Sequence, residues 1–353
     1  MLNIPVIVFA LIIVLSNYFL TRWFIRYAKV KRITDIPSER SSHVTPTPRG
    51  GGIGFVTIVT SCFLLYLIIW GGSGKTELFT FFGVILLISL IGWFDDRKDL
   101  SRRIRLGVQL FSSLVILIVI SNLSYMTFPY ADSVYLGFAG TLMGVIWIIG
   151  TTNIFNFMDG VDGISSVQAI FAGIGWALLF YLNGEPNLFV LQIFLLSGVI
   201  AFLVLNWPPA KIFMGDVGSL YLGFLFAVMP FLASAAIPAT EIGDMIWFGA
   251  ILLWPFLFDG SFTIIRRLIR GENIFEAHRS HLYQRLNIIG WPHKSISTLY
   301  ALFSAVTLVF AFSFLMSGDL ARLSIIILLV MLSIIYTLSV YKAEQIHPVE
   351  TGD

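Results

Sequence analysis

Two adjacent carboxylates stand at the end of an apolar stretch, within the segment Gly-Trp-Phe-Asp-Asp-Arg-Lys-Asp that ends at Asp99. Asp95 and Asp99 are four residues apart, so a helix would present both on one face, with Asp96 beside them. Adjacent carboxylates repel each other, and proteins tolerate such a pair where a cation or a proton is handled. A solvated helix end balanced by Arg97 and Lys98 is the competing explanation of this cluster.

A second polar cluster recurs every third residue, at Asn153, Asn156, Asp159 and Asp162. On a helix these side chains would form a slowly rotating stripe, and the glycine after each aspartate would permit close approach of a ligand. No Lys or Arg lies nearby in the sequence, and unpaired carboxylates at a membrane-facing helix end are costly. The pattern therefore favours a metal or a cation from another loop over an ordinary capped helix end.

The third cluster occupies the segment from Asn206 to Ser219, with Lys211, Phe213 and Asp216 inside it. Two consecutive prolines end the preceding helix, so Asp216 is expected to begin the next one. Aspartate is a favoured N-cap at the positive end of a helix, which explains this one residue in structural terms. The combination of amide, amine, aromatic ring and carboxylate goes beyond a cap and favours a binding site.

Basic residues gather in two further connections. The loop from Arg266 to Ser295 contains His278, Arg279 and His281, and three glycines follow Arg49 after a proline-rich stretch. Both connections would satisfy the usual excess of basic residues on the cytoplasmic side without any further role. A zinc site is disfavoured because no cysteine or acidic ligand adjoins the histidines. We interpret the histidines and Arg279 as anion-binding, and Arg49 with its glycines as a phosphate contact weaker than a P-loop.

The composition places these clusters in a membrane protein. Of 353 residues 57% are hydrophobic and 12% are charged, against roughly 25% charged in a typical soluble domain. A net charge of +2 gives no field for a polyanion, which excludes a nucleic-acid binder, and the single cysteine, Cys62, gives no support for redox chemistry. We therefore predict an all-α polytopic membrane protein with a single domain over residues 1–353.

Eleven apolar runs are long enough, at about 17–22 residues, to be transmembrane helices. The expected spans are 4–24, 52–70, 78–94, 107–122, 134–152, 164–182, 187–205, 218–236, 244–263, 297–316 and 321–341. With the N-terminus outside, every Lys and Arg falls on the inner side except Lys75 and Arg322. Because basic residues accumulate in cytoplasmic loops, this asymmetry predicts a cytoplasmic C-terminus and all polar clusters at the cytoplasmic face.

Together the clusters would bring carboxylates, amides, histidines and arginines to one membrane face. This set suits a Mg²⁺-bound diphosphate, because Mg²⁺ takes one or two carboxylates and completes its shell with phosphate oxygens and water. The neighbouring apolar helices would accept a lipid, so the residues predict phosphoryl chemistry between a soluble anion and a membrane lipid. One alternative is a transporter or flippase for sugar nucleotides or lipid-linked sugars, although transporters usually place polar groups at the bilayer midplane. A purely structural membrane protein would leave the acidic clusters unexplained.

Four motifs in this order, GWFDDRKDLS, NIFNFMDGVDG, NWPPAKIFMGDVGSLYLG and AHRSHLYQRL, resemble those of the polyprenyl-phosphate N-acetylhexosamine-1-phosphate transferases, glycosyltransferase family 4. The resemblance covers nearly the whole chain. The His-x-x-His form and the PTPRGGG segment are more similar to the O-antigen-initiating branch. The peptidoglycan translocase has a contiguous histidine triplet where this sequence has Arg279 and Ser280, which argues against a muramyl-pentapeptide donor.

The resemblance implies roles for individual residues. The implied catalytic residues are Asp95, Asp96 and Asp159, and the implied ligands of Mg²⁺, or of Mn²⁺ in its place, are Asp216 and Asp95. The implied substrate-binding residues are Asn153, Asn156, Asp162, Asn206, Lys211, Phe213, His278, Arg279, His281 and Arg49. Among them Phe213 would stack on uracil, with a core aromatic as the alternative for one of 32 phenylalanines.

The implied reaction transfers an N-acetylhexosamine-1-phosphate, or a deoxy variant, from a UDP-sugar to undecaprenyl phosphate, releasing UMP. Either the lipid phosphate attacks the β-phosphorus directly, or an aspartyl-phosphate forms first. The resemblance further implies a bacterial inner membrane, a role at the start of a lipid-linked surface glycan such as the O-antigen of lipopolysaccharide, and a homodimer as one form of assembly. Replacement of Lys75 or Arg322 by alanine is expected to leave activity unchanged, because both are predicted on the outer side.

Overall fold

The computed structural model describes residues 3–31, 33–35, 45–72, 75–98, 100–237, 241–273 and 278–346. Within these ranges the chain forms thirteen helices and four short strands. Asp99 of the first acidic cluster, and much of the proline-rich stretch before Arg49, lie outside the described residues.

The helices follow the apolar runs of the sequence. In chain order they are α1 (Ile4–Lys31), α2 (Gly52–Trp70), α3 (Lys75–Lys98), α4 (Arg102–Val119), α5 (Gly137–Phe157), α6 (Ile164–Leu182), α7 (Pro186–Asn206), α8 (Asp216–Ala236), α9 (Ile242–Leu252), α10 (Trp254–Ile269), α11 (Leu282–Ile288), α12 (His293–Met316) and α13 (Asp319–Ile346). The strands form two antiparallel pairs, β1 (Thr34–Asp35) with β2 (Thr47–Pro48) and β3 (Tyr125–Phe128) with β4 (Ala131–Tyr135).

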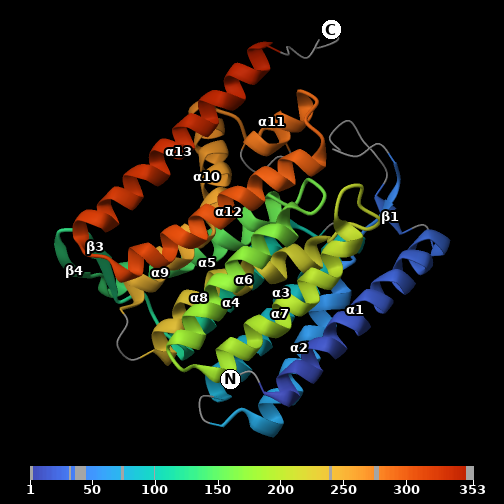
Figure 1. Ribbon diagram of the computed structural model, residues 1–353, viewed down its shortest axis with the longest axis horizontal. Helices are drawn as coiled ribbons and strands as arrows, with labels where there is room; N and C mark the ends of the chain where they lie inside the picture. Colours follow the sequence, from blue (N-terminus) through green and yellow to red (C-terminus); the bar gives the residue numbers. More distant parts are fainter. Residues whose placement is uncertain are drawn as a thin grey trace.

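Helix α8 is the centre of the bundle. Of its most apolar 18-residue window 94% is buried, and it packs against α2, α3, α5 and α9. The corresponding windows of α1 and α13 are only 22% buried, and these two helices lie on opposite sides of the molecule (Figure 1). Their exposed side chains are largely apolar, as expected for surfaces that face lipid rather than water.

Among the described residues, nine helices are long and apolar enough to cross a membrane, and the bent pair α9–α10 would make a tenth. The pair bends by 83°, with Pro255 in the first turn of α10, where a missing N–H is tolerated. Helix α4 occupies the remaining expected position, but it begins with Arg102, Arg103 and Arg105. The nearly all-helical, polytopic fold is confirmed, whereas the count of eleven spans and the orientation of the termini stay predictions.

The structure departs from the expected elements between α4 and α5. The sequence suggested a span from residue 134, but Ala131–Tyr135 pairs with Tyr125–Phe128 as a hairpin, so α5 begins at Gly137. This hairpin lies at one end of the bundle, and β1 and α11 lie towards the other (Figure 1). The polar clusters of the sequence gather at the end that carries β1 and α11.

Close helix contacts at that end depend on glycine. A Cβ atom on Gly92 of α3 would lie 2.5 Å from the carbonyl oxygen of Asp216, at the start of α8. A Cβ on Gly52, at the start of α2, would lie 2.6 Å from the Cα of Gly218. Since real Cβ atoms essentially never approach so closely, these glycines let α2 and α3 pack directly against the first turn of α8.

At the opposite end, Arg322 joins three helices and the hairpin. Its Nη1 contacts Asp244 of α9 at 3.2 Å, and its Nε donates to the carbonyl oxygens of Phe314 and Ser317 at 3.1 Å. Asp244 also accepts a hydrogen bond from Thr127 of β3 at 2.8 Å. Arg322 therefore has a structural role, although it was expected to be silent for activity.

Replacing Arg322 by alanine should lower the midpoint of thermal unfolding in detergent, because a charge-assisted hydrogen bond of this kind contributes about 1.5–3 kcal/mol. The loss of helical circular dichroism on heating measures the change. Lys342→Ala, an exposed cation on the same helix, is the matched control and should leave the midpoint unchanged. Equal midpoints for both variants would contradict the structural role of Arg322.

Candidate active site

Asp96, near the end of α3, holds the start of α8 in place. Its Oδ1 accepts a hydrogen bond from the backbone N–H of Asp216 at 2.9 Å, and its Oδ2 accepts one from the N–H of Val217 at 3.1 Å. The carboxylate thus satisfies free donors at the positive end of α8 from another helix. Because the side chain is only 4% exposed and both oxygens are engaged, Asp96 fixes the position of Asp216.

Arg49 bridges these two aspartates. Its Nε lies 2.9 Å from Asp96 Oδ1, and its Nη2 donates to Asp216 Oδ1 at 3.1 Å. Burial alone would lower the pKa of the guanidinium, but the charges of Asp216 and Asp96 raise it above its ordinary value. Arg49 therefore stays positively charged and links the segment before α2 to α3 and α8.

The backbone around Arg49 is tied to the segment before α8. Gly51 N–H donates to the carbonyl of Phe213 at 2.9 Å, and Phe213 N–H donates to the carbonyl of Pro48 at 2.8 Å. This reciprocal pair sets Arg49 and Phe213 beside each other although they are far apart in the sequence. The glycines after Arg49 permit this close backbone approach, which is the structural reason for that part of the motif.

Asp95 is held by a second arginine. Arg105 Nη1, from α4, lies 2.5 Å from Asp95 Oδ2 and 3.7 Å from Asp216 Oδ2. The other Asp95 oxygen accepts a hydrogen bond from Leu100 N–H at 2.7 Å. Three carboxylates thus face two guanidinium groups, which leaves one negative charge in excess. Such an excess at a membrane-facing helix end favours an additional cation.

The turn before α8 sets the direction of Asp216. Gly215 adopts a φ of +76°, which side chains rarely permit, and a Cβ there would lie 2.6 Å from Asp96 Oδ2. Asn156, near the end of α5, then donates to Asp216 Oδ1 at 3.2 Å and to Ser219 Oγ at 2.8 Å. Helices α3, α4, α5 and α8 therefore meet around the Asp216 carboxylate.

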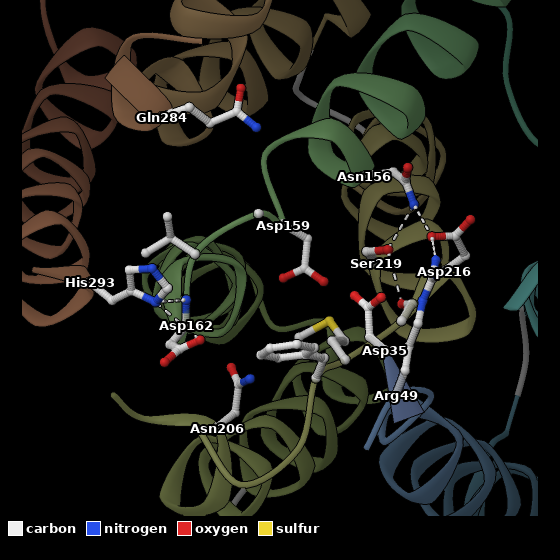
Figure 2. A pocket seen from close by; sticks show the side chains of 15 residues that line it. Asp35, Arg49, Asn156, Asp159, Asp162, Asn206, Asp216, Ser219, Gln284 and His293 are labelled. Carbon is white, nitrogen blue, oxygen red and sulfur yellow. Dashed lines mark hydrogen bonds and ion pairs between the residues drawn. The ribbon is translucent and has the colours of Figure 1, made fainter. Parts of the chain in front are cut away.

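A cavity of about 250 Å³ opens beside this cluster (Figure 2). It is lined by the predicted residues Arg49, Asn156, Asp159, Asp162, Asn206, Phe213 and Asp216, and also by Asp35, Gly160, Val161, Met214, Gly215, Ser219, Gln284 and His293. Side chains of the second and third clusters and of the segment before α2 therefore line the cavity, and the first cluster adjoins it through Asp216. The bundle fold accounts for this convergence, because each contributing segment lies at a helix terminus.

Asp159 points into the middle of this cavity (Figure 2). Burial raises the pKa of its carboxyl group to about 8, and the nearby Ser165 hydroxyl only partly offsets this effect. The negative charge of Asp216 acts in the same direction as burial, and Arg49 opposes it. Asp159 is therefore largely protonated at neutral pH.

Asp162 and Asn206 hold two walls of the cavity together. Asp162 Oδ2 accepts a hydrogen bond from Ala210 N–H at 2.9 Å, and its Oδ1 lies 3.2 Å from His293 Nδ1. The Asn206 side chain accepts from Gly163 N–H at 3.0 Å and donates to the carbonyl of Ile212 at 2.9 Å. Both side chains border the cavity, but these contacts commit them largely to positioning its loops.

Other predicted site residues lie outside the cavity lining. Asn153 pairs with Gln109 of α4 through a 2.7 Å hydrogen bond, so its amide joins two helices. Lys211 is exposed, and Arg279 contacts Asn287 Oδ1 at 3.5 Å. Asp95 and Asp96 adjoin the cavity through Asp216 rather than lining it.

The two histidines of the His-x-x-His motif, which we interpret with Arg279 as anion-binding, lie in different surroundings. His281 is 2% exposed, and its Nδ1 lies 3.3 Å from the buried Asp259. Burial, together with His281, lowers the pKa of His278 to about 4, so His278 is neutral at neutral pH. Its ring contacts Ser280 Oγ at 2.9 Å.

Sequence reasoning missed several cavity residues, two of which lie outside the dense clusters. Asp35 belongs to the stretch considered as a connection, and His293 follows a Trp-Pro pair at the start of α12. Gln284 lies inside the AHRSHLYQRL motif, where an uncharged amide gives no distinct signal of a site. Asp259 gave a usable signal, since a lone acid within an apolar helix is rarely without function.

No three His, Cys, Asp or Glu side chains in the described part of the chain are arranged to hold a metal ion by themselves. A Mg²⁺ bound with a diphosphate needs only one or two protein carboxylates. Asp95 and Asp216 offer oxygen donors that both contact Arg105, in a cluster with one negative charge in excess. This donor set fits Mg²⁺ when phosphate oxygens and water complete the shell.

The raised pKa of Asp159 predicts a specific dependence on pH. Because the folded protein keeps this proton up to about pH 8 and the unfolded chain loses it near its ordinary value of about 4, stability should fall as the pH rises between these values. Infrared absorption of a protonated carboxylic acid at pH 7 measures the state directly. The band should disappear in Asp159→Asn and above about pH 9, whereas an Asp159 ionised at pH 6 would contradict the assignment.

Known proteins that are similar to this chain belong to the family that its motifs resemble. Residues 78–234, which include three of the four motifs, match the sequence model of glycosyl transferase family 4. The chain is 28% identical over 288 residues to a probable undecaprenyl-phosphate N-acetylglucosaminyl 1-phosphate transferase of Bacillus subtilis (strain 168), covering 77% of this chain and 76% of the relative. It is also similar to phospho-N-acetylmuramoyl-pentapeptide-transferases, with 25% identity for Lactococcus lactis subsp. cremoris (79% of this chain, 87% of the relative) and 27% for Streptococcus pneumoniae strain CGSP14 (58% and 67%). The resemblance of the motifs to glycosyl transferase family 4 is thereby confirmed over residues 78–234, and the O-antigen-initiating branch stays a prediction.

Proposed function

We propose that this protein transfers an N-acetylhexosamine-1-phosphate from a UDP-sugar to undecaprenyl phosphate in a bacterial inner membrane. An oxygen of the lipid phosphate attacks the β-phosphorus of the donor, the bond from that phosphorus to the bridging oxygen breaks, and UMP leaves with this oxygen. The product is a polyprenyl-diphosphate-linked sugar that begins a surface glycan, such as the O-antigen of lipopolysaccharide. The named relatives act on the same lipid class or on a phospho-sugar, which supports the proposal.

The convergence of Asp95, Asp96 and Asp216 beside a polar cavity carries this proposal. Two arginines contact the three carboxylates. The guanidinium groups could donate hydrogen bonds to phosphate oxygens, and the carboxylates could bind a cation at the same place. Phosphoryl transfer relies mainly on positioning and on electrostatic stabilisation of charged oxygens. A site with mixed charges at helix ends, next to apolar helices that can hold a prenyl chain, meets both requirements.

We assign the cavity to the nucleotide-sugar donor. Phe213 borders it next to Arg49 and would stack on the uracil ring, while Asn156 and Asp159 offer polar groups to the rest of the donor. A protonated Asp159 can donate a hydrogen bond to a carbonyl or phosphate oxygen, which a carboxylate cannot do. This explains how an acidic residue can face an anionic donor without repelling it.

Asp216 and Asp95 would hold Mg²⁺, with Mn²⁺ as a substitute. When bound, the ion would neutralise the donor diphosphate and the charge that develops on the departing UMP. Asp96 keeps Asp216 in place by accepting the first N–H groups of α8, and Arg49 and Arg105 hold the carboxylates apart from one another. These protein contacts would pre-organise the site before either substrate arrives.

Direct attack by the lipid requires no general base. The second pKa of a phosphate monoester is about 6, so the acceptor is mostly deprotonated at pH 7. The oxygens of Asp96 are engaged by Arg49 and by two backbone N–H groups, and those of Asp95 by Arg105 and Leu100. A carboxylate would have to leave these partners to attack the donor, so we favour direct attack over an aspartyl-phosphate.

The cytoplasmic face is the expected side for this chemistry. The basic residues that predict the orientation lie on the same connections as Arg49 and Arg105. The multiple apolar helices and the bacterial relatives indicate a multi-pass protein of the inner membrane.

The two chemical routes differ in what happens without the lipid. Direct attack predicts no UMP release and no covalent adduct when the protein is incubated with Mg²⁺ and a UDP-sugar alone. Intact-protein mass spectrometry and UMP detection measure both quantities, and addition of undecaprenyl phosphate should start turnover in the same sample. A mass gain equal to one sugar phosphate, with UMP released before lipid is added, would establish the covalent route instead.

Replacing Asp216 by asparagine should lower the rate of UMP release by at least about 100-fold, because the variant loses a charged metal ligand at the centre of the site. The matched control is Asp132→Asn, the same chemical change on the exposed strand β4 of the distant hairpin, which should retain the wild-type rate. Wild-type turnover by Asp216→Asn at ordinary Mg²⁺ concentrations would contradict the metal-binding role.

A further inference from the structure

Asp259 is the most completely buried carboxylate among the described residues, with no exposed surface. It lies in α10, after the bend with α9. Its Oδ1 accepts from Leu282 N–H at 2.9 Å, and its Oδ2 accepts from Tyr283 N–H at 3.1 Å and from the Tyr300 hydroxyl at 2.6 Å. His281 Nδ1 lies 3.3 Å from Oδ1, and Thr263 Oγ1 donates to Oδ1 at 3.3 Å, so five groups surround this carboxylate.

These contacts determine where α11 begins. Leu282 and Tyr283 are the first two residues of α11, whose free N–H groups would otherwise lack partners. The helix has only seven residues, too few to be stable without tertiary contacts. His281 N–H and the Gln284 side chain complete the turn through a 3.3 Å hydrogen bond. Asp259 therefore attaches a short helix to α10 from within the protein.

Helix α11 in turn forms part of the cavity wall. The Tyr283 hydroxyl donates to the carbonyl of Phe157 at 3.0 Å, two residues before Asp159. A Cβ on Gly160 would lie 2.2 Å from that hydroxyl oxygen, so Tyr283 rests directly on the Asp159 loop. Gln284 lines the cavity across from Asp216 (Figure 2). A shift of α11 would therefore move both Gln284 and the loop that carries Asp159.

We propose that Asp259 is a positioning residue for donor binding: it sets α11 so that Gln284 and the Asp159 loop form the sugar-nucleotide side of the cavity. The proposal rests on the proposed function. It predicts a selective effect, because Asp95, Asp96 and Asp216 are held by other contacts. Loss of the Asp259 contacts should weaken the donor and leave the lipid acceptor unaffected, whereas a merely structural acid would affect stability alone.

Asp259→Asn tests this with little change in shape. An asparagine oxygen can still accept from one side, but its amide would place N–H donors against the Tyr283 N–H or the Tyr300 hydroxyl. We expect the KM for the UDP-sugar to rise by about tenfold or more and the KM for undecaprenyl phosphate to stay within about twofold, because small displacements in a binding site have large kinetic effects. Steady-state UMP release with each substrate varied in turn gives both values.

Two further variants make the comparison specific. Tyr300→Phe removes one donor to the same carboxylate and should raise the donor KM in the same direction by a smaller factor. Asp244→Asn makes the same acid-to-amide change at the opposite end of the bundle, where Asp244 contacts Thr127 and Arg322. It should lower the unfolding midpoint and leave both KM values unchanged. If Asp259→Asn fails to fold, the donor KM of Tyr300→Phe is compared with that of Asp244→Asn instead.

Hydrogen exchange separates this proposal from the proposed function. In Asp259→Asn the amides of α11 should exchange faster than in the wild type, while those of α8 should be unchanged, whether or not any substrate is present. An unchanged α11, an unchanged donor KM, or equal rises in both KM values would overturn the positioning role. Absence of UMP release by the wild-type protein would instead contradict the proposed function, and the exchange measurement would still test the placement of α11.

Discussion

The repulsion among carboxylates at the ends of apolar helices is the constraint on which this structure depends. Asp95 and Asp96 are adjacent near the end of α3. Asp216, the first residue of α8, donates its backbone N–H to Asp96 and contacts Arg105, the partner of Asp95. Arg49 and Arg105 come from two other segments to separate and neutralise them. The packing of α3, α4, α8 and the segment before α2 at one end of the bundle follows from this arrangement of charges.

The same constraint connects the fold to the proposed chemistry. A cluster of fixed charges with one negative charge in excess can accept a divalent cation, and its arginines can contact phosphate oxygens. Asp159 and Asp259 show two other ways in which a protein accommodates a buried carboxyl group. Burial and the charge of Asp216 outweigh the influence of Arg49 on Asp159, which keeps its proton, whereas Asp259 is surrounded by donors and organises α11. The environment of each carboxylate, rather than its residue type, therefore determines its role.

The sequence was sufficient to predict the helical membrane fold and the polar clusters, because apolar runs and charge placement are local properties. Each expected span overlaps a helix or the bent pair α9–α10, and most residues that line the cavity come from the predicted clusters. The hairpin before α5 and the bend in α9–α10 depend on tertiary packing that local composition does not specify. Likewise, the pairing of Asn153 with Gln109 and of His281 with Asp259 joins residues that lie far apart in the chain. The spacing of residues within a motif could not reveal that their side chains already have hydrogen-bond partners elsewhere in the protein.

The central claim is tested most directly by incubating the purified, detergent-solubilised protein with Mg²⁺, undecaprenyl phosphate and a panel of UDP-N-acetylhexosamines. Because detergent leaves no compartments, transport alone cannot generate a product. The account predicts stoichiometric UMP and a lipid-linked sugar diphosphate with at least one donor, and none of either when the metal is chelated. Binding of the sugar nucleotide without UMP from any donor would contradict the account and favour a transporter.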